Sequence, residues 1–261
     1  GFFKDQGFDM TIIPGRGSGK AVKIVGLGKT DFGYADLGAM IIGRAKGNMS
    51  RMVGMIIGKA PYVLYSLEPT GIRKPKDLEG KTIGSTSWSA LNVLFPAYAK
   101  INNIDTSKVK WVNMNTGSLI PSLLSGAVDV TAHYTGSGPM IEASAAKQGK
   151  KAVPLYHRDW GFNIYSNGLL VRDDTVAKKP RQVRRFLAAA YKGILWAMQN
   201  QDEAITILSK HNQALNPELA KKSWQVTLKE ILTEESRKHG LGYMVADKIR
   251  STRDLAVKYR K

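Results

Sequence analysis

The stretch KTIGSTSWSALNVLFPAYAKIN, residues 81–102, contains the pattern on which the fold prediction rests. Residues 81–84 are typical of a short buried strand, and apolar side chains then recur at helical spacing over residues 87–102. The loop between them, residues 84–90, has four hydroxyl side chains and an indole, which is more than one helix N-cap requires. The stretch therefore predicts a strand, a polar loop and a helix, with the loop at the carboxyl end of the strand.

The same pattern recurs along the first two thirds of the chain. Residues 1–7 read as the last turn of a helix closed by glycine, and they predict that a helix precedes Gly1. Alternating strands and helices predict α/β layers with largely parallel sheets. The predicted strands are 8–13, 31–35, 51–57, 62–66, 81–84, 109–114, 128–133, 152–156 and 168–171; the predicted helices are one that begins near residue 21, then 37–46, 87–102, 119–125 and 138–149.

The last third of the chain is predicted to be helical. Apolar residues at a 3.6-residue period indicate helices over 180–199, 203–211, 217–232 and 244–259. Two lobes follow if the chain crosses between them near 65–68 and returns near 163–168. The C-terminal helices would then pack on the first lobe.

Composition excludes several classes of protein. The chain has 261 residues, of which 43% are hydrophobic and 23% charged, as in globular proteins. No segment approaches the roughly 20 apolar residues that a membrane-spanning helix needs. Cysteine is absent, which excludes disulfides, thiolate nucleophiles, iron–sulfur clusters and zinc sites that need sulfur.

The net charge of +18 suggests a polyanionic partner, an anionic surface or an acidic ligand. The excess is spread along the chain with a C-terminal bias, and no basic cluster is interleaved with stacking aromatic residues. Solvated helix faces are therefore the favoured explanation. Nucleic-acid binding stays an alternative, and it predicts an affinity that falls steeply with salt.

The glycine-rich loop at residues 15–20 does not match a nucleotide-binding pattern. A Walker A loop that ends at residues 28–30 would need glycine where Lys23 stands, and a dinucleotide loop would need glycine in place of Lys20. What remains is a helix start that can bind a small anion or polar group. Ser18 fits a helix cap as well as a ligand contact.

The four histidines show no spacing typical of a metal site or a hydrolase. No metal, cofactor or catalytic residue is predicted, although a triad assembled through space stays open. Polar and aromatic residues instead follow several predicted strands, at 34–36, 84–90, 115–117 and 133–135. In doubly wound sheets such strand ends converge on one crevice.

Five blocks resemble a known family: residues 1–9, 28–36, 66–84, 124–130 and 167–174. The most specific is GIRKPKDLEGKTIG at residues 71–84. Together they resemble solute-binding proteins of ABC importers, in the group that takes thiamine-pyrimidine precursors, alkanesulfonates and nitrate. Members of this group begin with a strand that is expected to be missing from residues 1–261. The eukaryotic branch, which synthesises the thiamine pyrimidine, has a cysteine-rich metal motif, and because this sequence has no cysteine a similar synthase activity is not expected.

The resemblance implies a type II periplasmic-binding fold of two doubly wound lobes joined by two crossing strands. Lobe 1 would comprise residues 1–65 and 168–261, without its first strand, and lobe 2 residues 66–167. The C-terminal helices would lie on lobe 1. Positions carried over from the family give these ligand-binding residues: Ser18, Tyr34, Asp36, Ser85, Ser87, Trp88, Asn115, Thr116, His133, Tyr134, Trp160 and Phe162.

The resemblance also implies a function. The expected protein is a periplasmic monomer that captures a small polar ligand by hinge closure and delivers it to an ABC permease, its only contact with a membrane. Aromatic residues favour a planar aromatic or heterocyclic ligand, of the pyrimidine or aromatic acid type. Helix starts at Ser18 and Ser87 favour small organic anions such as alkanesulfonates as the alternative. Asp36 would either accept a hydrogen bond from a ligand amine or cap the helix after it, and an enzyme acting on the same ligand is the least favoured reading.

Overall fold

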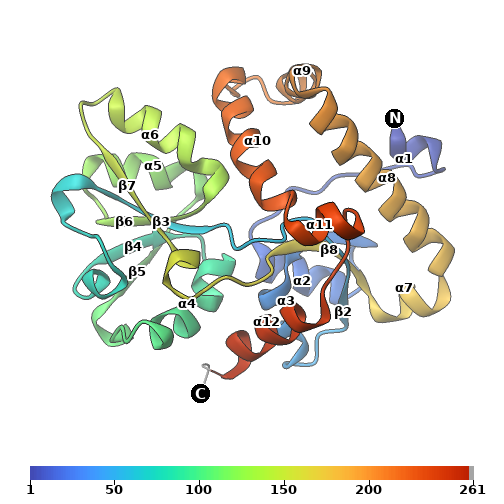
Figure 1. The fold of residues 1–261 in the computed structure, drawn as a ribbon, viewed down its shortest axis with the longest axis horizontal. Coiled ribbons are helices and arrows are strands. Elements are labelled where there is room, and N and C mark those ends of the chain that lie inside the picture. The colour runs from blue at the N-terminus through green and yellow to red at the C-terminus, as the bar shows by residue number, and fades with distance from the viewer. Residues whose placement is uncertain (259–261) are drawn as a thin grey trace.

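Two β-sheets form the framework of the computed structural model, which describes residues 1–258. The first two strands and the last belong to one sheet and the five strands between them to the other, and Figure 1 shows the two sheets side by side. The smaller sheet has the order β1-β8-β2 and the larger β5-β4-β6-β3-β7. Their bounds are β1 Phe32–Asp36, β2 Ser50–Met55, β3 Tyr62–Leu67, β4 Thr82–Ser85, β5 Lys110–Asn113, β6 Val130–Tyr134, β7 Ala152–Tyr156 and β8 Asn167–Arg172.

Strand directions differ from the prediction of largely parallel sheets. β4 runs parallel to β5 and β6, as predicted, but β3 is antiparallel to β6 and β7. In the smaller sheet β8 is antiparallel to both β1 and β2. The reason is that β3 and β8 enter directly from the other sheet, without a helix that would return the chain to the starting edge.

The chain passes between the sheets twice. The first passage is residues 56–61, between β2 and β3, and the second is residues 161–166, which lead into β8. The crossing predicted near 65–68 is wrong, because β3 is paired through Ser66 with β6 and through Leu67 with β7. The second passage overlaps its predicted position. We call residues 56–61 and 161–166 the two crossing segments.

Helices cover both sheets, and the C-terminal third is helical as predicted (Figure 1). Among the described residues no helix combines the length and apolar character that crossing a membrane requires. The predicted final residue of the last helix, Tyr259, lies outside the described residues. The helices are α1 Phe2–Asp5, α2 Ser18–Gly26, α3 Leu37–Arg44, α4 Ala90–Ile101, α5 Thr116–Ser125, α6 Gly138–Ala146, α7 Asp173–Lys178, α8 Pro180–Gln199, α9 Gln201–His211, α10 Pro217–Ile231, α11 Glu234–His239 and α12 Ala246–Lys258.

The predicted strand at residues 8–13 is wrong. This segment has no regular secondary structure and no strand partner among the described residues, and Ile12 and Ile13 are exposed. Alternating apolar residues predict a strand only where a neighbouring strand accepts its hydrogen bonds. Upstream, Phe3 of α1 packs on Phe186 of α8, with ring centroids 5.1 Å apart.

Three buried clusters explain why these segments hold together. The largest packs α4 on one face of the larger sheet, with Tyr62, Leu64 and Tyr98 fully buried in it. The opposite face, with Val63 and Tyr65, packs on α5 and α6. β3 is thus covered on both faces, which matches its nearly continuous apolar sequence. A third cluster packs α2 and α3 on the smaller sheet.

Candidate ligand site between the two sheets

The ends of several strands meet where the two sheets face each other, and we call this region the seam. From the smaller sheet, β1 ends at Asp36, which caps α3. From the larger sheet, the parallel strands β4, β5 and β6 end at Ser85, Asn113 and Tyr134. The carboxyl ends of parallel strands lie at one edge of a sheet, where α/β proteins bind ligands. The ends of β1, β4 and β6 thus come together at the seam, while one crevice shared by all the polar strand ends stays a prediction.

The two polar loops picked out in the sequence touch across the seam. The Gly19 N–H donates to the carbonyl of Trp88 at 3.2 Å. Gly17 has a φ of +99°, and a Cβ at this position would lie 2.4 Å from the same carbonyl oxygen. Only glycine allows both this backbone conformation and so close an approach. The loop before α2 and the loop before α4 are thus in direct contact, so the structure has the two sheets closed on each other.

Asp36 is completely buried, and both carboxylate oxygens accept hydrogen bonds from the protein. Oδ1 accepts from the Ala39 N–H at 2.9 Å, which caps α3. Oδ2 accepts from the Tyr62 hydroxyl and from Ser166 Oγ, the latter at 2.9 Å. Burial raises the pKa of Asp36, while these hydrogen bonds lower it. Asp36 therefore joins β1, β3 and the second crossing segment, and its role toward a ligand amine stays a prediction.

Ser18 and Tyr134 complete this polar group. Ser18 is buried at the start of α2, and its Oγ accepts from the Asp36 N–H at 3.2 Å. The ring of Tyr134 lies 5.9 Å from that of Tyr62. Burial raises the pKa of the Tyr134 hydroxyl, and the negative charge of Asp36 raises it further. We call Ser18, Asp36, Tyr62, Tyr134 and Ser166 the seam cluster.

Two exposed aromatic side chains flank the seam cluster. Tyr34, two residues before Asp36 on the same face of β1, is 49% exposed, and Trp88 before α4 is 46% exposed. Ser87, Asn115 and Thr116, which precede or begin α4 and α5, are also exposed. These five side chains are the predicted site residues that solvent reaches around the seam.

A cavity of about 800 Å³ lies next to Tyr34. It separates residues 8–16 from β1, and α2 forms one side. Its walls are mainly apolar, with Phe8, Ile24 and Phe32, and the charged residues that line it are of both signs: Arg16, Lys20, Lys29, Asp9 and Asp31. Sequence reasoning did not anticipate this cavity, because it depends on residues 8–13 not pairing with β1.

The structure places two of the predicted site residues, His133 and Trp160, away from the seam. His133 alternates with Tyr134 along β6, so it faces α5 and α6, where its ring packs edge-on against Tyr65. Phe162 lies in the second crossing segment with its ring 6.0 Å from that of Tyr62, but it is fully buried, so solvent does not reach it. The Trp160 carbonyl accepts from Asn102 at the end of α4, whereas Trp88 precedes its start. A helix of this length spans about 18 Å, so Trp160 and Trp88 lie at opposite ends of α4.

Ser85 is buried at the end of β4, and its carbonyl accepts from the Met114 N–H at 3.0 Å. Ser85 lies at the seam, but unlike the five exposed side chains it is not reached by solvent. Among the described residues there is no group of three or more His, Cys, Asp or Glu side chains placed to hold a metal ion.

Several residues of the site were not predicted. Tyr62 and Ser166 bind Asp36 from positions 26 and 130 residues away in the chain. Glu230 of α10 binds Thr135, which directly follows Tyr134, at 2.6 Å. Sequence signals for these contacts are weak, since a tyrosine in a buried strand and a glutamate near a helix end are common.

Comparison with known proteins identifies sequence relatives. A sequence model of the family described as NMT1/THI5 like matches residues 1–204. A 4-amino-5-hydroxymethyl-2-methylpyrimidine phosphate synthase of Legionella pneumophila is 21% identical over 233 residues, 87% of this chain and 72% of the relative. The riboflavin-binding protein RibY of Chloroflexus aurantiacus is 22% identical over 78% of this chain, which spans 58% of RibY.

Solved structures show the fold. A Candida albicans protein, described as having the generic periplasmic binding protein fold, aligns with a TM-score of 0.70 and 19% identity, over 99% of this chain and 82% of its own. The alkanesulfonate-binding protein SsuA of Xanthomonas axonopodis pv. citri, solved with MOPS bound, aligns with a TM-score of 0.70 and 13% identity. The alignment covers 86% of this chain and 76% of SsuA. The chain thus has the predicted α/β periplasmic-binding fold, with two sheets and C-terminal helices.

Proposed function

We propose that this chain, which belongs to the NMT1/THI5-like family, is a solute-binding protein for ABC import. It captures a small polar ligand at the seam as two lobes close, and it hands the ligand to a permease. The lobes correspond to the two sheets with their covering helices, joined by the crossing segments. A periplasmic monomer that meets the membrane only through the permease fits this role.

One observation carries the proposal: Tyr34 and Trp88 both reach solvent close to the seam cluster, Tyr34 from β1 of the smaller sheet and Trp88 from the loop after β4 of the larger sheet. Large aromatic side chains that remain half exposed beside buried polar groups are suited to hold a planar ring. Offset stacking on each ring contributes about 1 kcal/mol beyond the burial of surface. The preferred ligand is therefore an aromatic or heterocyclic molecule, of the pyrimidine or aromatic acid type, with Ser87 and Asn115 available for its polar edge. The names of the two sequence relatives, a pyrimidine phosphate synthase and a riboflavin-binding protein, agree with a heterocycle.

A small organic anion such as an alkanesulfonate is the alternative ligand. The starts of α2 and α4 lie at the seam, and helix starts favour negative charge. Three basic residues, Arg16, Lys20 and Lys29, line the neighbouring cavity against two acidic ones, Asp9 and Asp31, which leaves an excess of positive charge there. The SsuA structure, solved with the sulfonate MOPS bound, is an example of anion binding on this fold.

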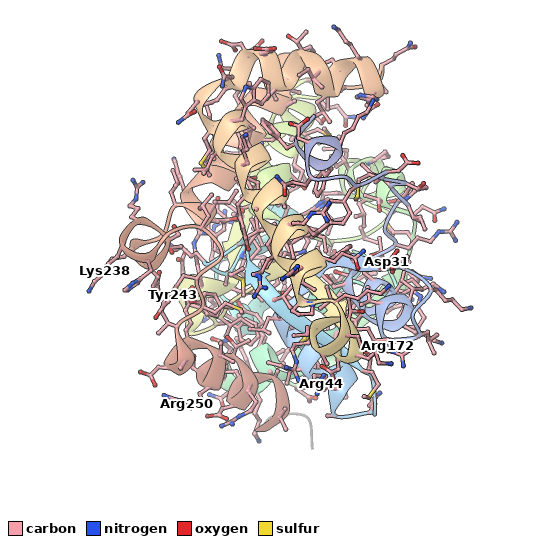
Figure 2. The ribbon with its side chains drawn as sticks, turned by 90° about the vertical axis from the view of Figure 1, so that its right-hand side faces the viewer. Asp31, Arg44, Arg172, Lys238, Tyr243 and Arg250 are labelled. Atoms are coloured by element: carbon pink, nitrogen blue, oxygen red, sulfur yellow. The ribbon has the colours of Figure 1, made fainter. Side chains whose placement is uncertain are left out.

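Ligand binding is favoured over nucleic-acid binding and over catalysis. Acidic side chains interrupt the basic surface, where Arg44 lies 2.8 Å from Asp173 and Arg172 lies 3.2 Å from Asp174; Figure 2 shows both arginines on one face. The pyrimidine phosphate synthase relative makes an activity on the same ligand the competing hypothesis. Recovery of chemically unchanged ligand after long incubation supports binding without turnover.

The test is thermal unfolding with aminopyrimidines, aromatic carboxylates, alkanesulfonates and short oligonucleotides, each at low and high salt. A ligand that binds only the folded state stabilises it by about 2.7 kcal/mol at 100 times its Kd, which is readily measured. A shift by one small-molecule class that persists at high salt supports the proposal. A shift by oligonucleotides alone, at low salt alone, overturns it.

A variant links any such shift to the seam. Tyr34→Ala removes one proposed stacking surface and is expected to weaken binding of a ring ligand about tenfold or more. Tyr243→Ala is the matched control, because Tyr243 is 48% exposed and stacks on His239 instead. Figure 2 shows Tyr243 across α8 from Asp31, which lines the cavity beside Tyr34. Equal loss in both variants would contradict the proposed site.

A further inference from the structure

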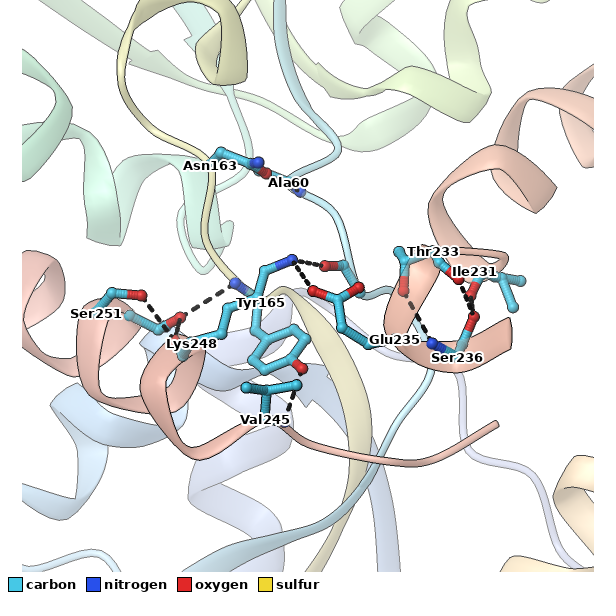
Figure 3. A network of polar contacts seen from close by, with 12 residues as sticks. Ala60, Asn163, Tyr165, Ile231, Thr233, Glu235, Ser236, Val245, Lys248 and Ser251 are labelled. Atoms are coloured by element: carbon cyan, nitrogen blue, oxygen red, sulfur yellow. Dashed lines mark hydrogen bonds and ion pairs between the residues drawn. The ribbon is translucent and has the colours of Figure 1, made fainter. Parts of the chain in front are cut away.

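The C-terminal helices hold both crossing segments. Lys248 Nζ of α12 donates to the Gly58 carbonyl at 2.6 Å and lies 3.5 Å from Glu235 of α11. Thr252 Oγ1 of α12 accepts from the Tyr165 N–H at 3.1 Å. Figure 3 shows this network, together with the hydrogen bond from the Ala60 N–H to Asn163 that joins the two segments.

The same helices are anchored to the smaller sheet. The Tyr191 hydroxyl of α8 donates to the Met55 carbonyl at 3.0 Å. The Met55 N–H in turn donates to the carbonyl of Gly242, which precedes α12, at 3.2 Å. These contacts anchor α8 and the segment before α12 to the smaller sheet, while α10 also packs against α6 and residues 135–137 beside the larger sheet.

Glu230, at the end of α10, reaches across to the larger sheet. Its backbone carbonyl accepts from the Gly58 N–H of the first crossing segment at 2.9 Å. Its Oε1 accepts from Thr135 Oγ1 at 2.6 Å and from Arg158 Nη1 at 2.9 Å. Glu230 is only 3% exposed, so this carboxylate has been taken out of water for these partners.

The two partners continue strands of the larger sheet. Thr135 follows Tyr134 at the end of β6, and its N–H donates to the Pro61 carbonyl at 2.8 Å. Arg158 follows β7, with its guanidinium 4.8 Å from the centroid of the Tyr156 ring. One side chain thus connects α10 to the ends of two strands of the other sheet, next to the seam cluster and beside the crossing segment.

We propose that Glu230 is a positioning residue for ligand capture: it holds the two sheets closed and keeps Tyr134 in place at the seam. The inference rests on the proposed function, in which closure completes the binding site. Opening about the crossing segments separates Glu230 from Thr135 and Arg158. Hydrogen bonds to a charged group are strong enough that their loss shifts the ratio of open to closed molecules about tenfold or more. Affinity for the ligand decreases when a smaller fraction of the molecules is closed, so Glu230 sets the affinity without touching the ligand.

The experiment measures closure directly and without ligand. The chain has no cysteine, so spin labels attach only to cysteines that are introduced. Two are introduced: Lys147→Cys, just after α6, and Lys210→Cys, in α9. The distance distribution between them is measured in the otherwise unchanged chain and in Glu230→Gln. Glu235→Gln is the matched control, because Glu235 also pairs with a cation at a crossing segment but does not reach the larger sheet.

In Glu230→Gln we expect the ratio of the long-distance to the short-distance population to be about tenfold higher than in the parent chain. In Glu235→Gln we expect the ratio of the parent chain. Arg158→Lys retains the positive charge and is expected to open less than Arg158→Met. A Glu230→Gln distribution that matches the parent chain in a folded protein overturns the proposal, and so does equal opening in Glu235→Gln.

Circular dichroism shows whether each variant is folded. If Glu230→Gln does not fold, the pair Arg158→Lys and Arg158→Met decides alone, and equal distributions in these two overturn the proposal. The proposed function fails separately, when no small molecule in the ligand panel shifts unfolding of the parent chain.

Discussion

The Tyr62 hydroxyl donates a hydrogen bond to Oδ2 of Asp36, although the two residues belong to different sheets. Both side chains are buried, and Ser166 of the second crossing segment binds the same oxygen at 2.9 Å. The closed arrangement therefore contains a carboxylate whose donors come from both sides of the seam. A buried carboxylate that loses a donor is costly, so this contact ties folding to closure.

Replacing Tyr62 by phenylalanine tests this link. The change removes one donor from a buried carboxylate and leaves the ring in place, so we expect the free energy of unfolding to fall by about 1.5–3 kcal/mol. Urea unfolding at neutral pH measures it. Tyr191→Phe is the control, because that hydroxyl donates to the uncharged Met55 carbonyl. Its loss should be about 1 kcal/mol, and an equal or larger loss would contradict a special role for the Asp36 contact.

Contact between the loops at Gly17 and Trp88 gives a second prediction. Gly17→Ala forces a side chain into a left-handed backbone conformation and against the Trp88 carbonyl. We expect it to separate the loops, with a loss of about 1–3 kcal/mol in stability and a shift of the spin-label distances toward the open form. Gly15→Ala, two residues earlier, is the control, since nothing lies within 4 Å of its Cβ position. If both variants behave alike, the Gly17 contact does not control closure.

The strands and helices could largely be predicted from the sequence, since their apolar periodicity reflects burial that the structure shows. Which strands pair with one another, and in which sheet, could not be predicted. β3 has the apolar run of a buried strand whichever sheet it joins, and its pairing with β6 and β7 decides where the chain crosses. Residues 8–13 alternate like a strand yet stay unpaired, because local pattern does not provide a partner strand.

Within the site, loop positions were more predictable than side-chain partners. Polar residues after a strand are visible in the sequence, and Ser18, Tyr34, Asp36, Ser87 and Trp88 lie at the seam. Strand alternation alone separates His133 from Tyr134, since neighbours in a strand face opposite sides of the sheet. The contacts of Tyr62 with Asp36 and of Glu230 with Arg158 connect distant segments, and only the three-dimensional arrangement shows them.

His133 gives a prediction about pH. Burial lowers its pKa to about 4, from an ordinary value of 6.5. Above pH 6.5 the ring is neutral in both the folded and the unfolded chain. As the pH falls below 6.5 the unfolded chain takes up a proton that the folded chain refuses, so stability falls until the pH reaches about 4. The loss from this one residue is about 3 kcal/mol over that interval.

The measurement compares the free energy of unfolding of the parent chain and His133→Gln at pH 7, 6 and 5. The variant should lose less stability than the parent as the pH falls, because it lacks the histidine that takes up a proton only when the chain unfolds. His211→Gln, at an exposed position in α9, is the control and should follow the parent. Parallel curves for the parent and His133→Gln would show that His133 is protonated in the folded protein as readily as in the unfolded chain.

Trp88 and Trp160 are both predicted from the sequence to bind the ligand, but in the structure only Trp88 lies at the seam. Both side chains are similarly exposed, 46% and 37%, but they lie at opposite ends of α4. We expect Trp88→Ala to weaken the ligand identified in the thermal panel about tenfold or more, because a ring at the seam loses a stacking partner. Trp160→Ala should change affinity less than about twofold, a difference under 0.5 kcal/mol. Isothermal titration of both variants provides the values. Loss of binding in Trp160→Ala with Trp88→Ala unaffected would move the ligand to the far end of α4, away from the contact between the two sheets.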